Sequence, residues 1–329
     1  MITARACSTG LRVAADGPQG RVPVRYPAGV SPTIEEVIAA IPDWTGRAVT
    51  ATAVAAGLTN SNFRVEVDGI PYFVRIPGAA TELLAVDRAN ELHNTRAAAA
   101  AGVSPRVAHS LPQWDVFVLD WLPARTMSNE AFAEPEAPTR IAATLRQLHA
   151  GPRFRDDFDM FRLSERYLAL VDARSVRIPA GYREHLDRIP RIEAALVAVP
   201  IPSVPCHNDL LAENYLDDGD RLWIVDFEYS GNGDPTFELA NTAQELGFDE
   251  VRLVELCTAY FGVATPALLA RTHLQMIMSD VGWTLWAAIQ ARISAIEFDF
   301  AAWAEERWAR AAAMLDGPEF DLWLRAARG

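Results

Sequence analysis

The order of apolar and polar residues divides the chain into a short strand-rich part and a longer helical part. Residues 48–55 and 63–67 alternate between the two kinds of side chain, and Asp68-Gly69 separates the second run from another at 72–76. Such alternation is typical of strands, and an Asp-Gly pair is typical of a tight hairpin. These residues therefore predict a small antiparallel sheet, which a strand at 115–121 extends.

Helical patterns dominate the rest of the chain. An alanine-rich helix is predicted at 81–101, ended by Gly102, and two short β segments at 205–210 and 221–229 interrupt the later helices. Those later helices are predicted at 139–150, 164–173, 181–199, 235–246, 249–262, 266–295 and 299–315. The sequence thus predicts an α+β fold with three parts. They are a flexible extension at 1–30, a small β-rich lobe at 31–122 and a larger, mostly helical lobe at 123–329.

The composition removes several kinds of chemistry. The chain has 329 residues and a net charge of -13, and all 30 of its basic residues are arginine. Without lysine, enzymes that form a Schiff base on a lysine are excluded. The phosphate-binding loop that ends in Gly-Lys-Ser/Thr is excluded as well. Any basic side chain that binds phosphate in this protein is therefore an arginine.

Charge and cysteine content bear on the partners and the cellular compartment of the protein. The acidic balance argues against a nucleic-acid partner, whose phosphates need a basic face. Cys7, Cys206 and Cys257 lie far apart, so neither a disulfide framework nor a pair of metal ligands is indicated, and a reduced cytoplasmic location is expected. No run of about 18 apolar residues occurs, so membrane insertion is not expected. The sequence carries no information on the oligomeric state.

One segment, Cys206-His-Asn-Asp-Leu-Leu-Ala-Glu-Asn-Tyr215, concentrates polar residues with a shared chemistry. Asp209 can accept a hydroxyl proton, and Asn214 offers an amide oxygen. Twelve residues later, Asp226 ends the apolar run Trp223-Ile-Val. Oxygen ligands suit magnesium, and phosphoryl transfer needs a base, metal ligands and a clamp for phosphate. The spacing therefore favours a phosphotransferase site over the alternative that Asp226 only caps the loop after its strand.

The pattern His-x-Asp-x-x-x-x-Asn, followed by Ile-Val-Asp-Phe-Glu-Tyr, resembles the aminoglycoside phosphotransferase and choline kinase superfamily, with a match over residues 35–315. The resemblance implies a protein-kinase-like fold with ATP and Mg²⁺ as cofactors. It implies that Asp209 is the catalytic base, that Asn214 and Asp226 bind magnesium, and that His207 braces the loop. Glu228 stands where choline kinases also have glutamate, and it is expected beside the metal in the substrate site.

The strand-rich part resembles the nucleotide site of the same superfamily. Gly57-Leu-Thr-Asn-Ser-Asn62 resembles the loop that covers the phosphates, and Arg75 stands in the usual position of the kinase lysine. An arginine fork suits phosphate oxygens. Glu91 is the expected partner of Arg75, although Asp87 is a rival and Glu91 also fits a solvated helix face. The expected nucleotide-binding residues are Gly57, Asn60, Ser61, Asn62, Arg75, Glu91 and, in the hinge that holds adenine, Asp120 and Leu122.

Aromatic residues near the C-terminus indicate the substrate. Trp283 and Trp286 are three residues apart on a predicted helix and share a face, and Phe300 and Trp303 repeat this spacing. Such pairs suit a cage for a quaternary ammonium, but an aromatic core has the same pattern. The segment 282–300 resembles the C-terminal segment of choline and ethanolamine kinases. This resemblance implies that the four aromatics surround the head group of the substrate. The resemblance adds Tyr229 and Glu245 to that site, and it leaves Trp308 and Trp323 to the core.

The expected substrate is therefore a small cationic alcohol, choline or ethanolamine. An aminoglycoside, homoserine or thiamine kinase of the same fold is an alternative, in which Asp280, Glu297 and Asp299 would bind amines. A catalytically inactive binding protein of this fold would be expected to have lost Asp209, Asn214 or Asp226, and all three are present. One departure from the family is Glu238, which stands where aspartate is common.

Overall fold

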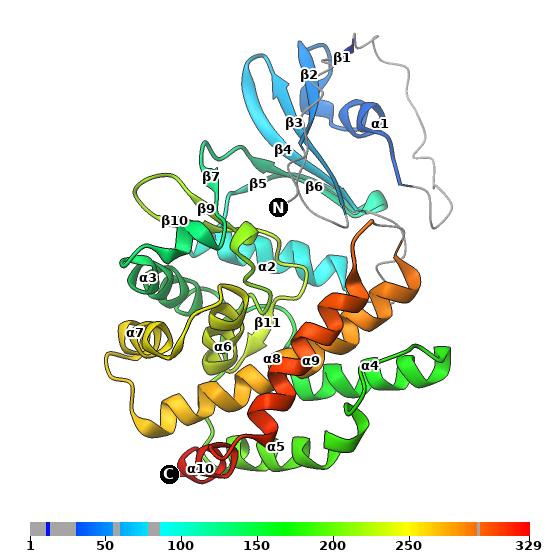
Figure 1. Ribbon diagram of the computed structural model, residues 1–329. Coiled ribbons are helices and arrows are strands. Elements are labelled where there is room, and N and C mark those ends of the chain that lie inside the picture. Colours follow the sequence, from blue (N-terminus) through cyan, green and yellow to red (C-terminus); the bar gives the residue numbers. More distant parts are fainter. Residues whose placement is uncertain (1–10, 14–30, 55–59, 78–85, 295–296) are drawn as a thin grey trace.

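The computed structural model describes residues 11–13, 31–54, 60–77, 86–294 and 297–329 (Figure 1). An antiparallel sheet lies at one end of the molecule, and the helices of the later chain form the larger part below it. The predicted α+β organisation, with a β-rich part followed by a helical part, is confirmed.

The sheet has six strands in the order β1-β2-β3-β4-β6-β5, and neighbouring strands are antiparallel. β3 and β4 form the predicted hairpin, and both Asp68 and Gly69 in its turn have positive φ. Alternate residues such as Val65 and Val74 are fully buried in one apolar core with α1 (Ile34–Ala39). The strands are β1 (Leu11–Val13), β2 (Val49–Val54), β3 (Asn60–Val67), β4 (Ile70–Pro77), β5 (Val107–Leu111) and β6 (Val116–Asp120).

Two strands of this sheet differ from the sequence prediction. β1 falls within the predicted flexible extension, whose other residues lie outside the described part of the chain. β5 is absent from the prediction because its sequence, Val-Ala-His-Ser-Leu, does not alternate between apolar and polar residues. In the structure four consecutive positions of this strand are half-buried.

Helix α2 (Arg88–Ala100) begins after the non-helical residues 86–87, and the start at residue 81 that the sequence predicts lies outside the described residues. The Asp87 carboxylate accepts hydrogen bonds from the N–H groups of Ala89 (2.8 Å) and Asn90 (3.0 Å). An aspartate in this role satisfies N–H groups that have no partner inside the helix, so the helix starts directly after it. Glu91 in the first turn is fully buried, and the solvated-face interpretation of this residue is therefore wrong.

Helix α8 (Pro266–Ile293) lies at the centre of the helical part. Its residues from Ala270 to Gln290 are all buried, and α4 (Met160–Arg174), α6 and α9 pack against it. Burial on every side explains why its apolar residues form no single stripe. The other α-helices described in this part are α3 (Ala137–His149), α5 (Ile189–Ala198), α6 (Pro235–Glu245), α7 (Glu250–Phe261), α9 (Phe300–Asp316) and α10 (Phe320–Ala326).

The predicted helix at 181–199 is divided in the structure. A 3₁₀ helix, Arg183–Arg188, precedes α5, and Pro190 stands in the first turn of α5. Proline has no N–H to donate to the preceding turn, so a continuous helix cannot pass through this position unbroken. Helix α10 is absent from the sequence prediction.

Short strands position the loops that carry the predicted catalytic residues. β8 (Val204–Cys206) pairs with β11 (Gly231–Gly233), and β9 (Tyr215–Asp217) lies between β7 (Arg125–Thr126) and β10 (Leu222–Ile224). The two predicted β segments are therefore shorter than expected, because the chain leaves β8 and β10 to form loops.

None of the helices in the described residues is both long enough and apolar enough to span a membrane. Helices α7 and α8 meet that criterion only as a pair, and the pair is bent by 117°.

Gly231, at the start of β11, lies in direct contact with a neighbouring backbone. A Cβ at this position would lie 2.9 Å from both the Cβ and the backbone nitrogen of Phe158, whose N–H donates to Asn232. We expect Gly231→Ala to lower the free energy of unfolding by about 1–3 kcal/mol, because the crowded backbone has to shift. Urea denaturation followed by circular dichroism measures this loss.

Gly233 in the same strand provides the matched control. The nearest atom to a Cβ there is the Phe158 backbone oxygen at 3.4 Å, an ordinary contact. Gly233→Ala is expected to lose clearly less stability than Gly231→Ala. Equal losses in the two variants would contradict the steric explanation.

Candidate active site

The loop after β8, residues 207–214, is held from behind by side chains of α6. The Glu238 carboxylate accepts hydrogen bonds from the backbone N–H groups of His207 and Asn208, the latter at 2.9 Å. The Asn241 side chain accepts from the N–H of Leu210 at 2.9 Å. Buried backbone donors need such partners, and both α6 side chains are fully buried. The glutamate that departs from the family pattern thus holds two successive N–H groups of this loop.

His207 connects the loop to the residues that follow β10. Its Nε2 donates to the backbone oxygen of Val225 (2.9 Å), and its Nδ1 accepts from the N–H of Asp209 (3.2 Å). Burial lowers the pKa of His207, which favours the neutral ring that this donor and acceptor arrangement requires. The contacts expected of a bracing histidine are therefore present.

Asn214 and Asp226 are brought together because β9 and β10 pair with Tyr215 opposite Ile224. The Asn214 side chain donates to the backbone oxygen of Asp209 (2.7 Å), which fixes the amide. Asp226 has a φ of 70°, and its side chain is 30% exposed. Amide and carboxylate oxygens are the ligands that magnesium prefers. The donor set therefore fits this ion, and Asn214 and Asp226 are the residues that would hold it.

Asp209 lies among other acidic side chains. Burial raises its pKa well above the ordinary range, and the charges of Glu245, Glu228 and Asp226 raise it further, opposed by Arg307. A carboxylate in such surroundings holds a proton more strongly than an exposed one, which suits a group that accepts a proton in catalysis.

Arg75 joins the sheet to the catalytic loops. From β4, its guanidinium pairs with Glu91 of α2 and with Asp226, and the residue is only 6% exposed. The predicted pairing of Arg75 with Glu91 is present, whereas the rival acid Asp87 caps α2 instead. Opposite charges so close together hold the fork of Arg75 beside the predicted metal ligand.

A second arginine, Arg88, completes this group of charges. Its Nη1 donates to Glu91 (2.7 Å) and to Glu228 (3.2 Å). Burial and the neighbouring charge of Arg75 lower the pKa of Arg88. Sequence reasoning missed this residue, although its place three residues before Glu91 puts both on one helix face.

The other predicted nucleotide residues flank Arg75. Asn62 lies opposite Arg75 in the β3–β4 register, and Asn60 and Ser61 precede it on β3. Gly57 lies outside the described residues. The Asp120 carboxylate is bound by the Arg106 guanidinium at 2.9 and 3.0 Å, so the predicted adenine contact rests on the backbone of Asp120 and Leu122.

Five aromatic side chains form a continuous cluster, called the aromatic wall below: Tyr229, Trp283, Trp286, Phe300 and Trp303. The ring centroid of Trp286 lies 6.3 Å from that of Trp283, 5.9 Å from Phe300 and 5.6 Å from Trp303. Tyr229 packs against Trp283 at 5.0 Å, and its hydroxyl accepts a hydrogen bond from Trp286 Nε1 (2.7 Å). The aromatics that helical spacing paired in the sequence are thus brought together with Tyr229.

Glu245 ends α6, but its carboxylate is already bound. Arg307 of α9 donates to both oxygens, at 2.6 and 2.7 Å. Asp280 on α8 is bound in the same way by Arg310, at 2.6 and 3.0 Å. Sequence reasoning missed both arginines. The available signal for Arg307 was its place four residues after Trp303, which puts the two on one helix face.

Four further residues that the sequence analysis considers lie outside the aromatic wall and the catalytic-loop contacts described above: Trp308, Trp323, Asp299 and Glu297. Trp308 is buried in the core and donates to the backbone oxygen of Ala180 (2.8 Å). Trp323 is half-buried, stacks on His273 at 4.6 Å and packs against the same core. Asp299 caps α9, and Glu297 is exposed.

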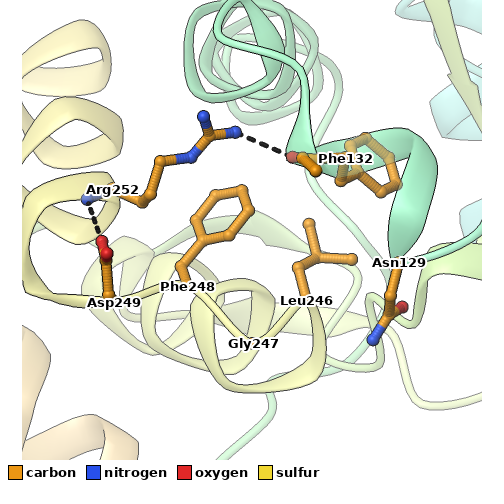
Figure 2. Close-up of a pocket in the computed structure, with 8 residues that line it drawn as sticks. Asn129, Phe132, Leu246, Gly247, Phe248, Asp249 and Arg252 are labelled. Atoms are coloured by element: carbon orange, nitrogen blue, oxygen red, sulfur yellow. Dashed lines mark hydrogen bonds between the residues drawn. The ribbon is translucent and has the colours of Figure 1, made fainter.

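A surface cavity of about 360 Å³ lies between the 3₁₀ helix Glu130–Ala133 and the turn from α6 to α7 (Figure 2). Arg252 crosses its edge and donates to the backbone oxygen of Phe132 at 2.7 Å. Its lining contains none of the site residues that the sequence predicts. The cavity is therefore separate from the loops that carry the predicted site residues.

Comparison with known proteins identifies relatives of the chain. The phosphotransferase enzyme family matches residues 50–273. The crystal structure of a choline/ethanolamine kinase family protein from Mesorhizobium loti has a TM-score of 0.77 and 39% identity, covering 88% of this chain and 96% of that one. Ethanolamine kinase 2 from Rattus norvegicus is 27% identical over 308 residues, 81% of this chain and 76% of its own length. Choline kinase LicA from Streptococcus pneumoniae has the same fold, with a TM-score of 0.69 and 22% identity, covering 80% of this chain and 93% of that one.

These similarities confirm the protein-kinase-like fold that the motif implies. The matched residues 50–273 include Arg75, Asp209 and Asp226, and they make up more than half of the chain. The chain therefore belongs to the choline/ethanolamine kinase family of phosphotransferases and is a small-molecule kinase.

Proposed function

We propose that this kinase transfers the terminal phosphate of ATP to the hydroxyl of a small cationic alcohol, with choline as the substrate. One observation carries the proposal. Asp226 lies beside Arg75 and near Asn214, whereas Tyr229, only three residues further along the same loop, belongs to the aromatic wall. A short alcohol with its cationic head on the wall therefore has its hydroxyl within reach of the carboxylates.

On the phosphate side, Arg75 supplies a planar fork for phosphate oxygens. Asn214 and Asp226 would hold magnesium, which offsets the negative charge of the phosphate oxygens when it is bound. Arg75 pairs with Asp226 in the structure, and with a cation held by Asp226 the guanidinium of Arg75 would be free to bind phosphate oxygens.

Asp209 acts on the acceptor. Its carboxylate orients the hydroxyl and accepts the hydroxyl proton as the new oxygen–phosphorus bond forms, while the bond from the terminal phosphorus to the bridging oxygen of ATP breaks and ADP leaves. His207 and Asn214 fix the backbone on both sides of Asp209, which keeps this carboxylate in place.

On the substrate side, the aromatic wall supplies the binding of the head group. A quaternary ammonium has no N–H group, so ring faces and apolar contact with its methyl groups have to hold it. Trp283, Trp286 and Tyr229 are 4%, 8% and 6% exposed, and a site that excludes water strengthens the attraction between a cation and a ring.

The test of the proposal measures ADP release from MgATP with choline as the acceptor. Ethanolamine and a multi-amine aminoglycoside are assayed separately as the alternative acceptors. We expect turnover with choline and a loss of about 10²–10⁴-fold in kcat for Asp209→Asn, because the amide cannot accept the proton. The Kd for ATP should barely change in this variant, since Asp209 acts on the acceptor. Near-normal kcat in Asp209→Asn would refute its role, and turnover of the aminoglycoside alone would refute the choline assignment.

The pH dependence of kcat/KM tests the surroundings of Asp209. Burial and acidic neighbours raise the pKa of Asp209. As pH falls, activity should therefore be lost at a pH well above ~4, the ordinary pKa of aspartate. In Glu245→Gln one negative charge is removed, so the pKa of Asp209 falls and the acidic limb moves to lower pH. A limb that moves to higher pH in this variant would contradict the electrostatic explanation.

The aromatic wall is tested with Trp286→Ala. One desolvated cation–ring contact amounts to about 2 kcal/mol, so we expect the KM for choline to rise by roughly 30-fold while the KM for ATP stays nearly unchanged. Trp323→Ala is the matched control, since this ring stacks on His273 in the core and should lower the melting temperature without changing the KM for choline. Unchanged choline KM in Trp286→Ala would remove the wall from the substrate site.

A further inference from the structure

Arg307 on α9 places a positive charge of the protein itself at the aromatic wall. The residue is 2% exposed, and its guanidinium carbon lies 3.9 Å from the centroid of the Trp303 ring. Its two terminal nitrogens also donate to the two oxygens of Glu245, at 2.6 and 2.7 Å. The guanidinium of Arg307 thus contacts both the Trp303 ring and the Glu245 carboxylate, two groups that the sequence predicts to bind the substrate.

The charges around Arg307 balance. Its Nη1 lies 3.5 Å from Asp280, which Arg310 binds through two hydrogen bonds and to which Gln244 donates at 2.6 Å. Two carboxylates and two guanidinium groups therefore alternate as Glu245, Arg307, Asp280 and Arg310. This corner of the site attracts a substrate through ring faces and contributes no net negative charge.

This arrangement treats two kinds of ammonium group differently. A primary ammonium carries three N–H donors, and each donor that leaves water needs an acceptor. Each oxygen of Glu245 already accepts a bond from Arg307, whose charge also neutralises this carboxylate, and the hydroxyl oxygen of Tyr229 accepts from Trp286. At the aromatic wall these groups are therefore weaker acceptors for a primary ammonium than a free carboxylate would be. A quaternary ammonium needs no acceptor and requires only ring faces and apolar contact.

We propose that Arg307 is a specificity-determining residue: by engaging both oxygens of Glu245 and lying over Trp303, it selects a quaternary ammonium over a primary one. The inference rests on the proposed function, since it concerns which amino alcohol the same site accepts. Arg307 itself contacts no reacting atom.

The test compares wild type with Arg307→Met, which keeps an apolar chain of similar length and frees the Glu245 carboxylate. A hydrogen bond to a charged acceptor becomes available to the primary ammonium, so the ratio of kcat/KM for choline to that for ethanolamine should fall about tenfold or more. A second readout is independent of turnover: the Kd values of tetramethylammonium and methylammonium, measured by quenching of tryptophan fluorescence. Their ratio should move in the same direction by a similar factor.

Arg310→Met is the matched control. It also removes one positive charge, the one that pairs with Asp280, but it leaves the contacts of Arg307 with Glu245 and Trp303 in place. Its choline to ethanolamine ratio should stay within about twofold of wild type. If Arg310→Met shifts the ratio as far as Arg307→Met, net charge determines selectivity and the proposal is overturned.

Arg307→Lys decides the matter if circular dichroism shows that Arg307→Met does not fold. Lysine keeps the charge but cannot bind both oxygens as a fork, so the ratio should fall in the same direction by a smaller factor. A wild-type ratio in the folded variant, or a wild-type enzyme that prefers ethanolamine, overturns the inference. A wild-type enzyme that phosphorylates neither alcohol refutes the proposed function itself, which distinguishes the two failures.

Discussion

The geometry of the loop at residues 207–214 depends on one buried carboxylate. Glu238 is fully buried, accepts from two successive backbone N–H groups of the loop, and lies 3.5 Å from His149 Nε2 of α3. A buried donor left without its partner costs about 1–3 kcal/mol, so these bonds strongly favour one loop conformation. Asp209 follows the two residues so held. Its direction is therefore determined by a carboxylate of α6 that holds the loop from behind.

All basic residues of the chain are arginine, and guanidinium groups join the sheet and α2 to the loop after β10. A guanidinium offers a planar set of five donors and can bind two carboxylates at once, whereas an ammonium is a compact point charge. Arg75 thus pairs with Glu91 and Asp226 together, and Arg88 pairs with Glu91 and Glu228. The sheet, α2 and the loop after β10 are connected through this chain of shared carboxylates. The relative position of the residues predicted to bind nucleotide and metal follows from guanidinium geometry.

Local signals in the sequence are sufficient to predict most elements and to single out the candidate catalytic residues. The Asp68-Gly69 turn and the spacing of Asp209 and Asn214 can be recognised within a few neighbouring residues. The pairing of Arg75 with Glu91 was accessible through the family resemblance. The contacts of Arg88 with Glu228 and of Arg307 with Glu245 were not accessible, because they join residues 140 and 62 positions apart. Nothing in a local pattern indicates which distant acid a given arginine meets.

Helices α6 and α8 are fastened to each other at two points. Arg271 near the start of α8 binds Asp234, the cap of α6, at 2.7 Å, and Asp280 further along accepts from Gln244 near the end of α6 at 2.6 Å. With a rise of 1.5 Å per residue, these ties are about 14 Å apart along α8, enough to prevent sliding or rotation of one helix on the other. The tryptophans of α8 and the loop support of α6 therefore share one rigid frame.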